Sequence, residues 1–193
     1  MKTKLIFASK NPNKLAEIKS TVRTFEVVGL KEMGIVEDIA ETGTSLEENA
    51  LIKSQYIYQK TGLSCFADDT GLEVDALGGR PGVYSARYAG EQATAEDNMQ
   101  KLFFEMEGQK NRRARFRTVI SLILNAKEYS FEGQVEGEIL HHKPGDDGFG
   151  YDPIFNPAGY DQSFAEMTME QKNKISHRGL AIKKLLHFLS HRS

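Results

Sequence analysis

Two adjacent carboxylates, Asp68 and Asp69, follow the apolar run of residues 64–67. Neighbouring side chains of an extended chain point to opposite sides, so only one of the pair can face a given site. Three further acids are near in the sequence, namely Glu41, Glu73 and Asp75. Mg²⁺ is typically held by one or two carboxylates, with water and substrate phosphates at its other positions. The acids therefore fit a magnesium-dependent reaction on a phosphate, while Asp-Asp-Thr-Gly is also typical of a plain turn.

A polar loop that could bind phosphate separates an apolar run at residues 5–8 from a stretch with helical spacing. In such a loop, backbone N–H groups and the helix dipole converge on an anion. It lacks the glycine and lysine spacing of a Walker A motif. We expect Lys14 to supply charge, and the serine and the asparagines to supply hydrogen bonds, to a phosphate. The alternative is a capped helix with solvated lysines. The loop residues are Ser9, Lys10, Asn11, Pro12, Asn13 and Lys14.

The segment from Gly148 to Pro153 combines glycines with aromatic rings. Glycine lets the backbone approach a ligand closely. The rings of Phe149 and Tyr151 could stack on a base, with Asp152 as a hydrogen-bond acceptor. A tight turn with aromatic residues in the core is the other interpretation of this segment.

Basic side chains gather near the start of the last expected helix. If Ser176 caps that helix, His177 and Arg178 occupy its first turn, and Lys172 lies just before it. Donors at the positive end of a helix dipole favour an anion or a strongly accepting carbonyl. A solvated surface cluster is the alternative. The arginines of residues 112–117 alternate at strand spacing, which favours a solvent-exposed strand face over a nucleic-acid surface.

The elements that must position these residues follow from periodicity and capping. A capping box at Ser45 predicts a helix that ends at Gly62, and Thr94 can cap another. Residues 64–67 read as a buried strand with the acid pair at its carboxyl end. The other expected elements are a strand at 5–8, strands at 114–124 and 129–139, and helix starts at Thr168 and Ser176. Together they predict one α/β domain, residues 1–193, with a mixed central sheet that allows two lobes around a cleft.

Composition narrows the function classes. The chain has 25 Lys and Arg against 27 Asp and Glu, a net charge of -2, which disfavours broad electrostatic binding to nucleic acid or an anionic membrane. Cys65 is the only cysteine, so an intramolecular disulfide and a zinc site of several thiolates are excluded, and burial is its expected state. The apolar run at residues 5–8 is too short for a signal peptide or a membrane span. We therefore expect a cytoplasmic protein.

These residues together resemble the inosine triphosphate pyrophosphatase family. Seven blocks match in family order, and they extend from one end of the chain to the other. The blocks are residues 9–14, 41–50, 66–72, 76–88, 148–155, 163–167 and 172–179.

The resemblance implies hydrolysis of deaminated purine nucleoside triphosphates (ITP, dITP and XTP) to the monophosphate and pyrophosphate, which removes them from the nucleotide pool. It also implies an elongated mixed sheet flanked by helices, a cleft between two lobes, a homodimer and a requirement for Mg²⁺. A related pyrophosphatase acting on other modified triphosphates is one alternative. A nucleic-acid-binding module is another, and the net charge of -2 speaks against it.

The resemblance also assigns roles to individual residues. Asp69 would be the base and, with Glu41, a metal ligand, and Glu47 or Glu48 could share or replace the role of Glu41. Residues 9–14 and Lys53 would hold phosphates, and Thr70 would touch substrate. A 6-oxo purine would be recognised by donors of the last helix. The residues expected on the base or completing the phosphate contacts are Phe149, Gly150, Tyr151, Asp152, Lys172, His177 and Arg178.

Overall fold

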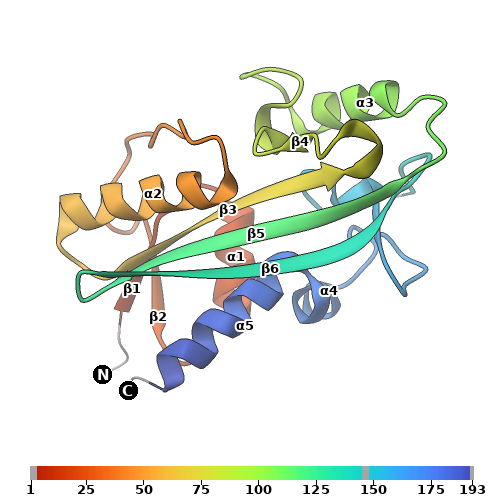
Figure 1. Ribbon diagram of the computed structural model, residues 1–193. Helices are drawn as coiled ribbons and strands as arrows, with labels where there is room; N and C mark the ends of the chain where they lie inside the picture. The colour runs from red at the N-terminus through yellow and green to blue at the C-terminus, as the bar shows by residue number, and fades with distance from the viewer. Residues whose placement is uncertain (1–3, 145–147, 192–193) are drawn as a thin grey trace. The chain divides into compact units, whose positions relative to one another are not determined.

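The computed structural model describes residues 4–144 and 148–191 of the chain (Figure 1). Its seven-stranded sheet has the order β2-β1-β3-β5-β6-β7, with β4 paired to β3. β1 is parallel to β2 and β3, whereas β3–β4 and β6–β7 are antiparallel, so the predicted mixed sheet flanked by helices is confirmed. The strands are β1 (Lys4–Phe7), β2 (Glu26–Gly29), β3 (Cys65–Val74), β4 (Pro81–Gly82), β5 (Arg113–Leu124), β6 (Lys127–Ile139) and β7 (Phe155–Pro157).

Five α-helices and three short 3-10 helices make up the rest of the regular structure in the described ranges. The α-helices are α1 (Pro12–Thr21), α2 (Leu46–Thr61), α3 (Ala95–Glu105), α4 (Met169–Ile175) and α5 (His177–Ser190). The 3-10 helices are η1 (Asp75–Leu77), η2 (Ser85–Arg87) and η3 (Asp152–Ile154). No helix in these ranges is long and apolar enough to cross a membrane.

The described residues form two compact units, each with its own core. Unit 1 contains residues 4–69, 118–133 and 178–191, and unit 2 contains residues 70–117, 134–144 and 148–177. Strands β3, β5 and β6 each contribute residues to both units.

Unit 1 buries both faces of its strands. Alternate residues of β1 enter different cores, Leu5 and Phe7 with α1 and α5, and Ile6 with α2. Figure 1 shows α2 on one side of these strands and α1 and α5 on the other. Burial on both faces requires a continuous apolar strand rather than an alternating one. This explains the four-residue apolar run at the start of the chain.

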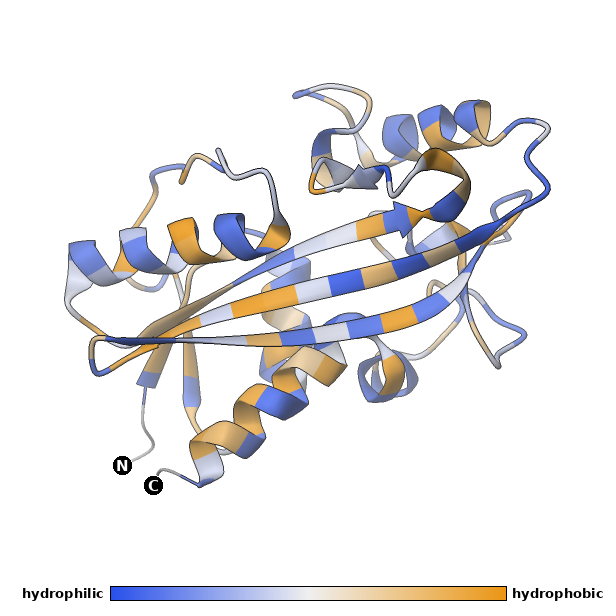
Figure 2. Cartoon of the chain, viewed as in Figure 1, coloured by the Kyte–Doolittle hydropathy of each residue, from blue (hydrophilic) through white to orange (hydrophobic). Residues whose placement is uncertain are grey.

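The colouring of β5 in Figure 2 shows the same rule within one strand. Its unit 1 part is a nearly continuous hydrophobic block, residues 119–124, whereas its unit 2 part alternates. On the alternating part, Arg115 and Arg117 both donate to the carboxylate of Glu73, at 2.6 and 3.0 Å. These two arginines are therefore engaged in ion pairs, while Arg113 is exposed.

The acid pair lies inside β3, which corrects the prediction that it follows the end of a strand. β3 continues through both aspartates to Val74. By strand alternation Asp68 shares a face with Phe66, which packs in the α1 and α5 core, and Asp69 shares a face with Ala67, which packs near α2. The predicted divergence of the two side chains is thus confirmed, and they lie on opposite faces of the strand.

Capping explains why several helix boundaries were predictable. Gly62 ends α2 in the left-handed conformation, with φ 67°, and Thr94 and Thr168 form reciprocal capping boxes. Ser45 accepts from the Glu48 N–H, yet the Glu48 carboxylate binds Thr44 rather than the cap, so this capping box is only half formed. Both predicted helix starts near the C-terminus are used, by α4 and α5.

Three local features complete the comparison with the sequence. Strand β2 was not predicted. The three glycines and the proline of residues 78–82 predict an irregular loop, whereas Pro81 and Gly82 form the two-residue strand β4. Cys65 is buried as expected, its Sγ donates to the carbonyl of Ser54, and burial raises the pKa of its thiol to about 12. Such a thiol is inert at neutral pH.

Candidate active site

Lys53 joins two acids on the α2 face of unit 1. Its Nζ lies 2.6 Å from Glu41 Oε1 and 3.1 Å from Asp69 Oδ1. Lys53 is 7% exposed. Burial alone would lower the pKa of Lys53, but the charges of Asp69 and Glu41 raise it overall, so the ammonium stays protonated at neutral pH. Three predicted site residues are therefore brought together.

Asp69 has the properties of a general base. Its second oxygen, Oδ2, is buried and has no hydrogen-bond partner in the described part of the chain. Burial raises the pKa of Asp69 above its ordinary value, against the opposing charges of Lys53 and Lys14. A carboxylate with a raised pKa and an available oxygen can accept a proton from a water molecule.

A divalent cation fits the same two carboxylates. Glu41 and Asp69 already converge on one cation, the Lys53 ammonium, and Asp69 Oδ2 offers a further oxygen. Within residues 4–144 and 148–191, no three His, Cys, Asp or Glu side chains gather as a metal-binding group. Two carboxylates with open positions is the donor set that Mg²⁺ uses when substrate phosphates complete its shell.

The carboxylate of Glu48 binds Thr44, which makes Glu48 a weaker candidate for a metal ligand. Glu48 Oε2 accepts from the N–H and the hydroxyl of Thr44, at 2.6 and 2.9 Å, and these bonds lower its pKa. Glu47 is exposed on the first turn of α2. Glu41, by contrast, contacts the ammonium of Lys53, the cation that Asp69 also binds.

A second buried ionic network lies on the opposite face of β3 in unit 1. Asp68 binds Lys14 Nζ at 3.1 Å and Arg178 Nε at 3.0 Å, and Arg178 Nη1 also pairs with Glu17. Burial alone would raise the pKa of Asp68, but Lys14 and Arg178 hold it well below its usual range. Burial lowers the pKa of Lys14 in spite of Asp68.

The phosphate loop is shaped by its own side chains. Asn11 caps α1, and its side chain accepts from the N–H groups of Asn13 and Lys14, at 2.9 and 3.3 Å. Ser9 Oγ accepts from the Asn11 N–H at 3.2 Å. Pro12 begins the helix. The two lysines differ, because Lys14 points to Asp68 whereas Lys10 Nζ binds Asp38 at 2.7 Å and the carbonyl of Val36.

Glu17 is a buried acid that the sequence analysis did not identify. It is 4% exposed and pairs with Arg178, 161 residues later in the chain. The apolar residues of α1 recur around it at helical spacing. In the sequence it is indistinguishable from an exposed acid beside an apolar stripe, so no local signal could have found it.

Unit 2 has a cluster of a different kind, built on Lys172. Its Nζ binds Asp152 Oδ2 at 2.7 Å and lies 4.5 Å from the centre of the Phe149 ring. Asp152 Oδ2 also accepts from the Phe149 N–H at 3.1 Å. Gly148 has φ 84°, and a Cβ there would lie 2.9 Å from Asp152 Cβ, so the turn requires glycine. Three predicted residues are thus held as one group around a half-buried aromatic ring.

Two other predicted residues of unit 2 belong to its core. Tyr151 is 4% exposed, its hydroxyl donates to the Ser85 carbonyl at 2.9 Å, and burial raises the pKa of the phenol. The His177 ring stacks on Phe116 at 4.5 Å with an interplanar angle of 18°. Thr70 is half-buried in β3. For Tyr151 these contacts favour the interpretation of a turn with a core aromatic.

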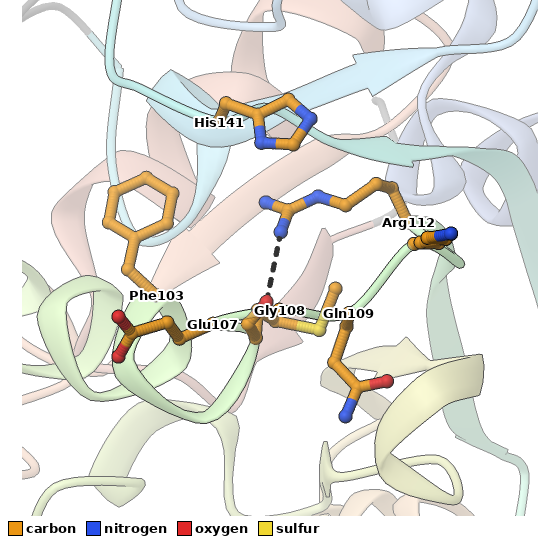
Figure 3. Close-up of a pocket in the computed structure, with 8 residues that line it drawn as sticks. Phe103, Glu107, Gly108, Gln109, Arg112 and His141 are labelled. Atoms are coloured by element: carbon orange, nitrogen blue, oxygen red, sulfur yellow. Dashed lines mark hydrogen bonds between the residues drawn. The ribbon is translucent and has the colours of Figure 1, made fainter.

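A cavity of about 620 Å³ in unit 2 is separate from every predicted site residue. Figure 3 shows Arg112 among its lining residues, donating to the backbone carbonyl of Met106. The other two nitrogens of the Arg112 guanidinium donate to the carbonyls of Ile139 and Leu140. Arg112 therefore ties backbone segments together. The lining residues are Phe103, Met106, Glu107, Gly108, Gln109, Lys110, Arg112 and His141.

A mixed α/β sheet that carries a buried lysine beside an available carboxylate oxygen fits an enzyme suited to phosphoanhydride chemistry. The chain belongs to the Ham1 family, whose model matches residues 5–188.

Known proteins similar to the chain agree with this class. It is 53% identical over 188 residues to the dITP/XTP pyrophosphatase of Flavobacterium johnsoniae, covering 97% of this chain and 98% of the relative. The dITP/XTP pyrophosphatase of Bacillus subtilis is 45% identical, with 93% of each chain covered. The structure of the Staphylococcus aureus Ham1 protein superimposes with a TM-score of 0.89 at 41% identity, covering 99% of this chain and 100% of that one.

Proposed function

We propose that this protein hydrolyses the deaminated purine nucleoside triphosphates ITP, dITP and XTP to the monophosphate and pyrophosphate. Relatives about half identical over nearly the whole chain bear the name dITP/XTP pyrophosphatase. The observation that carries the mechanism is the buried oxygen of Asp69, available beside the Lys53 and Glu41 pair.

The reaction is attack of water on the α-phosphorus. Asp69 accepts a proton from the water, and its raised pKa makes it a stronger base than an ordinary aspartate. Lys14 and Lys53 neutralise charge on the triphosphate, which otherwise meets the carboxylates of the site at close range. Pyrophosphate is the leaving group, so the mechanism needs no covalent intermediate.

Magnesium is part of the proposal. Glu41 and Asp69 would hold it, and it would supply charge neutralisation and polarisation of phosphate oxygens when bound. A homodimer and a cytoplasmic location also belong to the proposal, on the strength of the family resemblance.

Base recognition is assigned to the Phe149 ring and to donors at the start of the last helix. The Phe149 ring, held by its contact with Lys172, can stack on a purine. Donors at His177 and Arg178 would prefer a 6-oxo group, because adenine presents an amino group at that position. In this structure Arg178 Nε and Nη1 donate to Asp68 and Glu17, so its contact with the base stays a prediction.

A panel of ITP, dITP, XTP, GTP and ATP tests the proposal, with products followed by phosphorus NMR at saturating Mg²⁺. We expect monophosphate and pyrophosphate, and a preference for ITP over ATP of about 10⁴-fold, the scale reached by sites that hydrogen-bond the discriminating group. Diphosphate and orthophosphate as products would contradict the bond assignment. Full activity after exhaustive chelation would contradict the metal assignment.

A further inference from the structure

Asn49 is a buried side chain whose two polar ends have different surroundings. It is the fourth residue of α2 and is 0% exposed. Its Oδ1 accepts from the Gly43 N–H at 2.8 Å. Its Nδ2 is buried and has no hydrogen-bond partner among the residues that the structure describes. Leaving a buried donor without an acceptor costs free energy, so an acceptor supplied by a ligand or a water molecule would be stabilising.

The direction of this amide is fixed by chemistry. The Gly43 N–H is a donor, so only the oxygen of Asn49 can face it and Nδ2 must point elsewhere. The loop is also seated tightly, because a Cβ on Gly43 would lie 2.7 Å from both Asn49 Oδ1 and Glu48 Cβ. Glu41 lies two residues before Gly43 in the same loop. Asn49 therefore helps to fix the segment that carries Glu41.

The position of Asn49 on α2 places it beside the proposed catalytic group. Asn49 and Lys53 are four residues apart and both buried, so they lie on one face of the helix, one turn apart. Lys53 contacts Glu41 and Asp69, and Asp69 Oδ2 is itself a buried acceptor with no partner in the described ranges. A donor and an acceptor are thus both left available around the same lysine.

Asn98, at the equivalent helix position, has hydrogen-bond partners for both polar atoms of its side chain. It is the fourth residue of α3, 4% exposed, and its Oδ1 accepts from the Ala89 N–H at 2.7 Å. Its Nδ2, however, donates to the Ala86 carbonyl at 3.1 Å. At both helix starts an asparagine oxygen therefore holds the preceding loop. The two differ in whether the described residues supply an acceptor for the amide nitrogen.

We propose that Asn49 is a ligand-contacting residue of the active site, whose Nδ2 donates to an oxygen of the bound triphosphate or of the attacking water. Its Oδ1 at the same time holds the loop that carries Glu41. This proposal rests on the proposed function, because it places the acceptor in the substrate complex. It assigns a role to an amide nitrogen that has no hydrogen-bond partner within residues 4–144 and 148–191.

Two variants isolate the Nδ2 donor. Asn49→Asp keeps an acceptor for Gly43 but adds a charge, whereas Asn49→Leu stays uncharged but loses that acceptor. Removal of Nδ2 is the change that they share. Asn98→Asp is the matched control, because it makes the same substitution at the same helix position in unit 2.

The measurements are thermal unfolding, the affinity for α,β-methylene ITP with Mg²⁺, and kcat and KM for ITP. We expect the analogue affinity or kcat of both Asn49 variants to fall by about 10-fold to 100-fold, the range for a hydrogen bond to a charged group. Weaker analogue binding would assign the acceptor to the triphosphate, and a lower kcat with unchanged analogue binding would assign it to the water. Asn49→Asp should keep the melting temperature of the wild type. Asn98→Asp should lower the melting temperature, because its carboxylate would face the Ala86 carbonyl. Asn98→Asp should also keep the nucleotide affinity.

Wild-type kinetics separate this proposal from the proposed function. If the wild-type enzyme hydrolyses ITP and either Asn49 variant matches it in both affinity and kcat, the Asn49 proposal is wrong and the function stands. A wild-type enzyme without ITP hydrolysis would overturn the function and this proposal with it. A lower melting temperature in both Asn49 variants with unchanged kinetics would show a purely structural asparagine.

Discussion

The two units hold their lysine ammonium groups in different ways. In unit 1, Lys14 and Lys53 are held by carboxylates alone, and a buried carboxylate oxygen of Asp69 has no partner in the described ranges. In unit 2, Lys172 is held by one carboxylate and by the face of the Phe149 ring. Charged side chains without aromatic rings suit a triphosphate, whereas an aromatic ring held by a cation suits the purine base of a nucleotide. Lys14 and Lys53 should therefore govern turnover on any nucleotide, and Phe149 the affinity for the base.

Replacement of the base in unit 1 should have the largest effect. Asp69→Asn keeps the size of the side chain and removes its ability to accept a proton. We expect kcat to fall by about 10²-fold to 10⁴-fold. The fall should be equal for ITP and ATP. Steady-state kinetics on both nucleotides, with circular dichroism as a check on folding, measure this. Turnover close to wild type would remove Asp69 from the mechanism.

Asp68→Asn should instead act on stability. The substitution removes the anion shared by the partly buried Lys14 and the buried Arg178, and breaking a buried ion pair costs about 3 to 5 kcal/mol. The pKa of Asp68 is below its ordinary value in the folded state, so its contribution is present above about pH 4 and is lost as the pH falls further.

Urea unfolding of wild type and Asp68→Asn at several pH values measures this difference. The free energies of unfolding should differ most at pH 7 and converge toward acid pH. A difference that does not change with pH would show that charge at Asp68 is not the cause. The adjacent Asp69→Asn variant is the matched control, because the pKa of Asp69 is shifted in the opposite direction.

Phe149→Leu should have a smaller effect, confined to the affinity for the base. The leucine keeps an apolar contact and loses the ring face, and stacking of one base on an aromatic side chain is worth about 1 to 3 kcal/mol. We expect KM for ITP and for ATP to rise together while kcat is kept. An unchanged KM would show that the ring braces Lys172 without touching substrate.

Lys10→Gln should have the smallest effect among the predicted site residues. Its ammonium binds Asp38 and the Val36 carbonyl, at an exposed position, rather than the carboxylates around Lys14. We expect kcat/KM to change by no more than about 3-fold, since exposed ion pairs contribute about 0 to 1 kcal/mol. A loss as large as that of Lys14→Gln would show that Lys10 turns toward the phosphates when substrate binds.

Local signals explain how much of the fold was predictable. Ser45, Gly62 and Thr94 mark helix ends through contacts a few residues away, and the apolar run of β1 reports burial on two faces. The course of β3 through Asp68 and Asp69 was not predictable, because polar residues inside a strand need partners. Those partners, Lys14 and Arg178, are 54 and 110 residues distant from Asp68.

The candidate site was predictable to the same extent. The residue types and the family resemblance identified Glu41, Lys53 and Asp69, which the structure brings together. They left open whether Tyr151 points into the core, and they could not indicate that Lys10 binds Asp38, since both depend on tertiary contacts. Glu17 was missed for the same reason.

Competition by fragments of the substrate tests most directly whether Lys14 contacts the phosphates and Phe149 the purine base. Magnesium tripolyphosphate carries the phosphates without a base, and inosine carries the base without phosphates. We predict that Lys14→Gln raises the inhibition constant of tripolyphosphate and leaves that of inosine unchanged, and that Phe149→Leu does the reverse. If either variant weakened both fragments equally, or if the pattern were exchanged, the assignment of phosphate contacts to Lys14 and of base contacts to Phe149 would be wrong.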